Sequence, residues 1–261
     1  MTLPLRIAFD MDGVLADMDT ELVRQAEILF GRPMTRPARD RGADADPAAT
    51  PRPAAAGETA ATTGSEQATA ETAPDNVPPL IRLNMSSRQQ RKLWHHVESI
   101  ENFWQTLNET EPGIVARLAA VATERRWEVI FLTKRPESAG ATAQVQSQRW
   151  LESKGFLLPS VYVVQGSRGR IAAALHLDIV IDDRPENCLD VVVDSTARAI
   201  LIWREDEKQL PAAARRLGIG VVKSVNDCLD ILTQVDGRDR EPPRVIDRVK
   251  RLLGLKQPAS A

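Results

Sequence analysis

The stretch IAFDMDGVLAD, residues 7–17, decides both the expected fold and the expected chemistry. Its first three residues are apolar and predict the end of a short buried strand. Asp10 and Asp12 follow at the end of that strand, and Gly13 allows the chain to turn sharply. Two carboxylates held so close repel each other. Keeping both ionised therefore requires a divalent cation, a shared proton or solvent.

Similar apolar runs recur along the chain and predict a parallel sheet. They are continuous rather than alternating, and segments with a helical spacing of apolar residues separate most of them. The runs are residues 5–9, 129–132, 161–164, 179–181 and 199–203, with a weaker run at 221–222. This pattern predicts an α/β fold, a Rossmann-like parallel sheet with helices on both faces. Ligands of such sheets bind at the carboxyl ends of the strands, where the aspartate pair lies.

The composition is that of a globular protein without an affinity for polyanions. Apolar residues make up 43% of the sequence and the formal net charge is −2, so no global field attracts nucleic acid or an anionic membrane. No apolar run is long enough to span a bilayer, and the N-terminus lacks a signal-peptide pattern. We therefore expect a cytoplasmic protein with no membrane span and no nucleic acid polymer as partner. The charged run REDEK, residues 204–208, is interpreted as a solvated loop or helix start.

Residues 36–79 interrupt this pattern. They contain no aromatic residue, and Val77 is their only large aliphatic one, so they cannot bury enough apolar surface to fold. We predict that this insert is disordered. The excursion that contains it opens beside the aspartate pair, which favours a helical cap over the site. The predicted organisation is an α/β core (1–17 and 110–235), a small helical cap after the first strand (18–35 and 80–109), the insert, and a basic amphipathic tail (236–261).

Two further predicted strands also end in polar residues. Thr133 and Lys134 close the second strand, and Asp182 and Asp183 close the fourth. The carboxyl ends of parallel strands meet at one edge of a sheet, so these groups should converge with the first aspartate pair. Four converging carboxylates favour an oxygen-preferring cation such as Mg²⁺. A metal, a hydroxyl and cations around a nucleophilic carboxylate suit phosphoryl transfer.

The ordered motifs DMDGVLAD, FLTKRP and IDDRPEN resemble those of phosphatases in the haloacid dehalogenase-like (HAD) superfamily. The resemblance implies that Asp10 is the nucleophile of an aspartyl-phosphate mechanism and that Asp12 is the general acid/base. It implies that Thr133 binds the transferring phosphoryl group. The acidic pair Asp182 and Asp183 would complete the Mg²⁺ site. Its other ligands would be the Asp10 carboxylate and the backbone carbonyl of Asp12.

The sequence departs from that family at one position. HAD phosphatases usually carry a lysine upstream of the last acidic motif, where this chain offers Arg168 and Arg170. We prefer Arg168 as the phosphate-binding cation, because a loop before a full helix suits its spacing, and Lys134 could share the role. An arginine keeps the charge but differs from lysine in reach and geometry.

Within the superfamily, the sequence is most similar to the 5′(3′)-deoxyribonucleotidases, through the stretches DGVLAD and FWQTLNETEPG. This resemblance implies a (deoxy)nucleoside monophosphate as the substrate, with its base in an aromatic pocket. Trp94, Phe103 and Trp104 are the candidates for that pocket, since aromatic faces stack on bases, and core packing is the alternative for them.

Three questions stay open at this level. The substrate could instead be a sugar phosphate or another small phosphorylated metabolite. The chain could also be a non-catalytic scaffold with the same fold, whose insert and tail recruit partners. The oligomeric state is undecided, with a homodimer among the alternatives.

Overall fold

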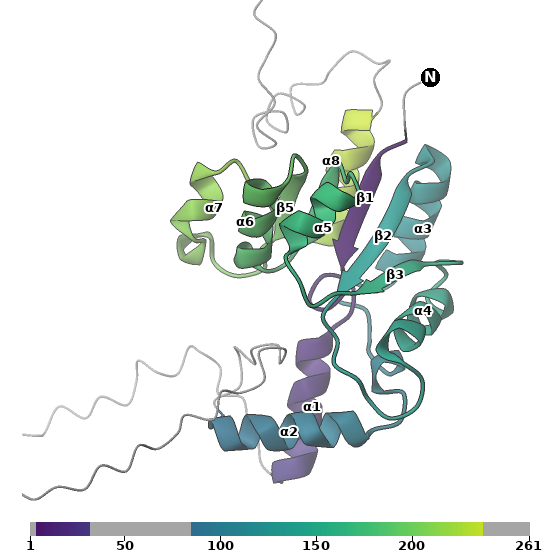
Figure 1. Ribbon diagram of the computed structural model, residues 1–261, viewed down its shortest axis with the longest axis vertical. Helices are drawn as coiled ribbons and strands as arrows, with labels where there is room; N and C mark the ends of the chain where they lie inside the picture. Colours follow the sequence, from purple (N-terminus) through teal and green to yellow (C-terminus); the bar gives the residue numbers. More distant parts are fainter. Residues whose placement is uncertain (1–3, 32–84, 237–261) are drawn as a thin grey trace, which may run out of the picture.

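The computed structural model describes residues 4–31 and 85–236 (Figure 1). The insert predicted at 36–79 lies outside the described residues, as does the tail beyond residue 236. In the described part, no helix is long and apolar enough to cross a membrane.

The described residues contain one six-stranded sheet, in which every neighbouring pair is parallel. Its order is β3-β2-β1-β4-β5-β6. The strands are β1 (Arg6–Asp10), β2 (Glu128–Thr133), β3 (Ser160–Val163), β4 (Ile179–Asp182), β5 (Arg198–Ile202) and β6 (Gly220–Val222). Each predicted apolar run overlaps one of them, so the α/β prediction is confirmed. The chain winds outward from β1 to β3 and then crosses back to β4, which makes the β1/β4 edge the switch point where such sheets bind ligands.

Helices connect the strands and cover both faces of the sheet. Those of the core are α3 (Ile114–Arg125), α4 (Ala143–Ser153), α5 (Arg168–Ala174), α6 (Pro185–Asp194), α7 (Ala212–Arg216) and α8 (Val225–Asp236), with a 3₁₀ turn η3 (Glu207–Gln209). Apolar side chains of α3, α4 and α8 belong to one buried cluster, and those of α5, α6 and α7 to the other.

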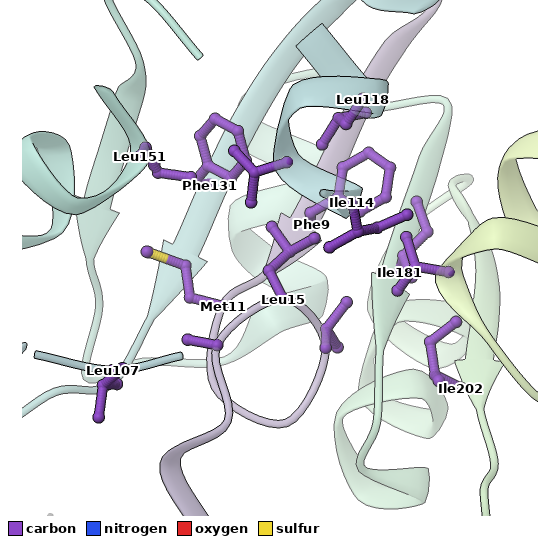
Figure 2. Close-up of a cluster of buried hydrophobic side chains, with 14 of the residues drawn as sticks. Phe9, Met11, Leu15, Leu107, Ile114, Leu118, Phe131, Leu151, Ile181 and Ile202 are labelled. Atoms are coloured by element: carbon purple, nitrogen blue, oxygen red, sulfur yellow. The ribbon is translucent and has the colours of Figure 1, made fainter. Parts of the chain in front are cut away.

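The alternation of side chains along β1 shows how the two clusters form. Ile7 and Phe9 contribute to the cluster with α3 and α8, whereas Ala8 contributes to the cluster with α5 and α6. Figure 2 shows Phe9 close to Ile114 and Leu118 of α3. Ile7, Ala8 and Phe9 are fully buried, which explains the continuous apolar run in the sequence. Burying a side chain the size of Phe9 stabilises the fold by about 1.5–3 kcal/mol.

Two helices, α1 (Met18–Phe30) and α2 (Ser87–Ser99), and a 3₁₀ turn, η2 (Phe103–Gln105), lie between β1 and β2. Figure 1 shows α1 and α2 crossing each other beyond the arrowhead of β1, on the side of the strand carboxyl ends. The Asp17 carboxylate caps α1 by accepting from the Thr20 amide at 3.1 Å, and Ser86 begins α2 with a reciprocal capping box. A helical cap therefore follows the first strand, as the sequence predicts.

Candidate active site

A cavity of about 660 Å³ lies at the carboxyl ends of β1, β2 and β4. Asp10 and Asp12 line it from the first strand, and Asp183 lines it from the fourth. The start of α1 and the loop after β5 form its outer walls, with Met18 and Trp203 among their residues. The polar ends of separate strands thus meet in one cavity, between the core and the start of the cap.

Three carboxylates form an acidic cluster, which we define as Asp10, Asp182 and Asp183. Each offers an oxygen atom, and these atoms lie within 4.8 Å of one another. Within the described residues, the Asp183 Oδ1 atom is buried without a hydrogen-bond partner. Three carboxylate oxygens at this spacing, one of them unsatisfied, fit a hard divalent cation such as Mg²⁺.

The electrostatics of this acidic cluster also favour a cation. Burial raises the pKa of Asp10 well above its usual range, and the neighbouring Asp182 raises it further. Burial raises the pKa of Asp182 as well. Burial and the charge of Asp182 together raise the pKa of Asp183 to about 7. At neutral pH, ionising all three carboxylates together therefore costs free energy, and a bound cation would offset that cost.

Gly13 explains how Asp183 comes so near the first strand. Its φ angle of +84° lies in the left-handed region, which glycine adopts without strain. A Cβ atom at this position would collide with the Asp183 carboxylate. Any other residue would therefore displace one member of the acidic cluster.

Arg168 is the cation that reaches the acidic cluster. Its side chain is buried, its Nη2 donates to Asp10 Oδ1, and its Nε lies 3.7 Å from Asp182 Oδ2. Its Nε and Nη1 atoms have no hydrogen-bond partner among the residues described. By contrast, the Arg170 side chain is 84% exposed and lies 3.8 Å from Asp194. The structure therefore places Arg168, and not Arg170, beside the predicted nucleophile.

The packing of α5 on α6 accounts for the position of Arg168. Ser167 begins α5 by accepting from the Arg170 amide at 3.1 Å. The Gly169 amide donates to Asp190 Oδ2 at 3.0 Å, and a Cβ atom on Gly169 would collide with the Asp190 carbonyl oxygen. This close approach of the two helices fixes the first turn of α5, which carries Arg168 towards the sheet.

The Asp12 carboxylate has different partners from those of the acidic cluster. It accepts from the Thr133 hydroxyl at 2.9 Å, and from Arg135 Nη2 at 2.7 Å and Nε at 3.0 Å. The Thr133 hydroxyl, which the sequence assigns to phosphoryl binding, is thus bonded to Asp12 here. Lys134 lines the cavity, and its ammonium has no ion-pair partner in the part of the chain described. Lys134 remains the candidate for contacting a phosphoryl group.

Sequence reasoning missed Arg135, although this residue lies within the motif FLTKRP. One signal was present: the following Pro136 restricts Arg135 to extended backbone, where neighbouring side chains point in opposite directions. Lys134 and Arg135 should therefore face different environments. The structure agrees, since Lys134 is half-buried at the cavity and the Arg135 side chain is completely buried.

Asn187 and Arg204 are two further residues of the site that the sequence did not identify. The Asn187 amide donates to Asp182 Oδ2 at 2.9 Å and so orients a buried member of the acidic cluster. Arg204 donates to the carbonyl oxygens of Gly13 and Val14, and its Nη2 lies 3.3 Å from Glu111 Oε1. Arg204 is exposed in a loop, as predicted for the start of residues 204–208, and it also contacts the turn after β1.

The structure does not bring the three predicted pocket aromatics to the cavity. Trp94, Phe103 and Trp104 are 3%, 0% and 0% exposed, and none is among the described residues that line it. Trp104 packs edge-on against Phe103 at 4.9 Å between ring centroids, and its Nε1 donates to the Pro136 carbonyl at 3.0 Å. The aromatic side chain at the cavity is Trp203, directly after β5. Sequence reasoning counted Trp203 as part of an apolar strand and so overlooked it.

No family model and no curated protein matches the sequence. Several solved structures have a similar fold. One is assigned as a β-phosphoglucomutase from Thermotoga maritima, at 15% identity and a TM-score of 0.48 over 88% of this chain and 99% of that chain. A hydrolase from Pseudomonas syringae matches at 15% identity and a TM-score of 0.45, over 90% of this chain and 100% of that chain. A haloacid dehalogenase-like family hydrolase from Streptococcus pneumoniae matches at 12% identity and a TM-score of 0.44, over 89% of this chain and 100% of that chain. Likenesses of this size do not assign an activity to this chain.

Proposed function

We propose that this protein is a Mg²⁺-dependent phosphomonoester hydrolase that works through an aspartyl-phosphate intermediate. The observation that carries the proposal is the arrangement around Asp10. Two further carboxylates lie close to this carboxylate, and its Oδ1 atom accepts from a buried arginine whose Nε and Nη1 atoms have no hydrogen-bond partner among the described residues. Such a site can hold a metal and a phosphoryl group at the same nucleophile.

In the first step, an Asp10 oxygen attacks phosphorus, an O–P bond forms, and the P–O bond to the leaving alcohol breaks. The buried Arg168 guanidinium lies beside Asp10, so its positive charge would offset the negative charge of the phosphoryl group, and the Lys134 ammonium at the cavity adds a second positive charge. Mg²⁺, held by the acidic cluster and the Asp12 carbonyl, would supply further charge neutralisation. Together, Arg168, Lys134 and the metal would balance the negative charge of the transferring phosphoryl group.

Asp12 serves both proton transfers in this scheme. It donates a proton to the leaving oxygen as the first bond breaks, and then accepts one from the water that hydrolyses the aspartyl-phosphate. The position of Asp12 supports this role, because it lines the same cavity as Asp10 and its carboxylate lies outside the acidic cluster. General acid/base assistance of this kind is worth about 10²–10⁴-fold in rate.

The substrate we propose is a (deoxy)nucleoside monophosphate. The cavity wall beyond the acidic residues is mixed, with the apolar side chains of Met18, Ile202 and Trp203 facing the same space as Arg184. Trp203 takes the place of the three aromatics expected from the sequence, because an indole face stacks on a base. Its ring is held by a hydrogen bond from Nε1 to the Asp206 carbonyl at 3.1 Å.

The test is phosphate release from a panel of nucleoside monophosphates and sugar phosphates, with and without Mg²⁺. Asp10→Asn should be inactive, and Asp227→Asn serves as the matched control, because Asp227 is exposed and does not line the cavity. Release led by a sugar phosphate would keep the mechanism and replace the substrate. Absence of release from the whole panel would argue for the scaffold alternative.

A further inference from the structure

Arg135 is a fully buried cation, and each of its three guanidinium nitrogens donates a hydrogen bond within the protein. Its Nε and Nη2 donate to Asp12, and its Nη1 donates to Ser147 Oγ at 2.9 Å. The side chain is 0% exposed. A buried charge costs several kcal/mol unless it is paired and hydrogen-bonded, so this arrangement depends on the Asp12 carboxylate. Each of its three nitrogens donates within the protein, and the side chain is too deeply buried to contact a substrate in the cavity.

The contact fixes the orientation of the Asp12 carboxylate. Arg135 Nη2 lies 2.7 Å from Oδ1, and Nε lies 3.0 Å from both Oδ1 and Oδ2. The Thr133 hydroxyl donates to Oδ2 at 2.9 Å. A planar guanidinium that contacts both oxygens defines the plane of the carboxylate, which the single charge of a lysine cannot do.

Arg135 is itself held by Trp104 and Ser147. Its guanidinium carbon lies 5.0 Å from the centroid of the Trp104 ring, within the range of a cation–π contact. The Ser147 hydroxyl accepts from Arg135 and donates to the Ala143 carbonyl at 2.7 Å, so its direction is set by α4. The Trp104 amide donates to Gln146 Oε1 at 3.0 Å, which ties the ring to the same helix.

We propose that Arg135 is a positioning residue for proton transfer by Asp12, an inference that rests on the proposed function. It holds the Asp12 carboxylate at the cavity wall and away from the acidic cluster, in the orientation needed to reach the leaving oxygen. Trp104 and Ser147 brace the guanidinium, so the buried tryptophan contributes to the site through Arg135 and not through the substrate. Displacing a reacting group by about 1 Å costs about 10²-fold in rate.

The experiment uses two phosphomonoesters that differ in their need for a proton. An alkyl phosphate has a poor leaving group that requires protonation, whereas p-nitrophenyl phosphate releases a stable phenolate without it. For Arg135→Ala we expect kcat on the alkyl substrate to fall about 10²-fold, with KM unchanged within about twofold. The initial burst of p-nitrophenol, which reports only the first step, should keep its rate. The slower turnover that follows should decrease, since water attack still needs Asp12.

Chemical rescue distinguishes positioning from a general structural role. Added guanidinium at low concentration should restore part of the activity of Arg135→Ala, and methylammonium, which carries the same charge without the planar fork, should not. Arg149→Ala is the matched control, because Arg149 lies exposed on the same helix as Ser147. It should match the wild type and show no rescue. If Arg135→Ala does not fold, Arg135→Lys replaces it, with the same loss expected from the missing second contact.

The outcomes test the positioning role of Arg135 separately from the proposed phosphatase function. Wild-type protein that releases no phosphate overturns the proposed function, and the positioning role with it. Active wild type with normal Arg135 variants overturns the positioning role alone. A rise in KM at constant kcat, or a burst rate that falls as much as the alkyl rate, also overturns it, since Arg135 would then act on substrate binding or on the nucleophile.

Discussion

Only one residue separates the two aspartates of the first motif, yet their environments are opposite. On the β4 side, Asp10 faces two other carboxylates, and two guanidinium nitrogens of the arginine beside it have no hydrogen-bond partner among the described residues. On the β2 side, Asp12 meets one arginine and one hydroxyl, and each guanidinium nitrogen of Arg135 donates to a protein group. The first side is thus incomplete without a ligand, whereas the second is complete within the protein. Substitutions on the two sides should therefore differ in their effect on stability as well as on activity.

The largest expected effect is the loss of activity in Asp10→Asn. Removing the nucleophile should lower kcat at least about 10³-fold. Stability should move the other way. The raised pKa of Asp10 means that its ionised form is disfavoured in the folded protein, and an amide removes that charge. We expect metal-free Asp10→Asn to melt above the wild type at pH 8, measured by thermal unfolding. A lower melting temperature would contradict the contrast between the two sides.

Asp12→Asn should lose both activity and stability. The rate should fall about 10²–10⁴-fold, because the proton transfers lose their acid/base group. The substitution also leaves the buried Arg135 without its counter-charge, which should cost about 3 kcal/mol of unfolding free energy. Denaturant unfolding measures this cost. A variant as stable as the wild type would show that Arg135 does not depend on Asp12.

Metal should stabilise the protein, and more so at high pH. Asp183 has a pKa of about 7 in the folded protein, and those of Asp10 and Asp182 are also raised. The folded state then binds more protons than the unfolded state between about pH 4 and pH 7, so metal-free stability attributable to these groups falls as pH rises. Mg²⁺ at about 100 times its Kd should restore about 2.7 kcal/mol. Melting with Mg²⁺ or a chelator, at pH 5.5 and pH 8, tests this, and a larger metal effect at pH 5.5 would contradict it.

The smallest expected effect concerns the cavity wall. Trp203→Ala should raise KM for nucleoside monophosphates about tenfold, since stacking on a base is worth about 1–3 kcal/mol. It should leave KM for a small sugar phosphate nearly unchanged. Steady-state kinetics on both substrates provide the comparison. An equal change for both would remove the argument for a nucleobase at Trp203.

The fold was predictable because its signals are local. Each strand of a parallel sheet is buried on both faces, so it leaves a continuous apolar run such as residues 179–181 that can be read without any neighbour. The helices of the cap carry their own start signals, as at Ser86 with Gln89. The insert at 36–79 was separable by composition, and its prediction stays untested because it lies outside the described residues.

The partners of the charged residues were harder to predict. Lys134 and Arg135 are adjacent in the sequence, and only Lys134 was considered for phosphate binding. Arg135 is buried against Asp12, whereas Lys134 lies at the cavity. Trp104 looked like a stacking platform, and it stacks on an arginine instead of lining the cavity. Arg204 is remote in sequence from the turn whose carbonyls it contacts. None of these pairings has a local periodicity that would reveal it.

By itself, the sequence determined which strands form and which of them end in carboxylates, because apolar runs and strand-end aspartates are properties of consecutive residues. It also determined that these carboxylates share one edge, since parallel strands bring their carboxyl ends together. Only the tertiary structure decided which cation meets which carboxylate: Arg168 with Asp10, and Arg135 with Asp12. That choice depends on strand order and on how α4 and α5 pack against the sheet. Strand order and helix packing set the distances of a few ångströms between residues that are far apart in the chain.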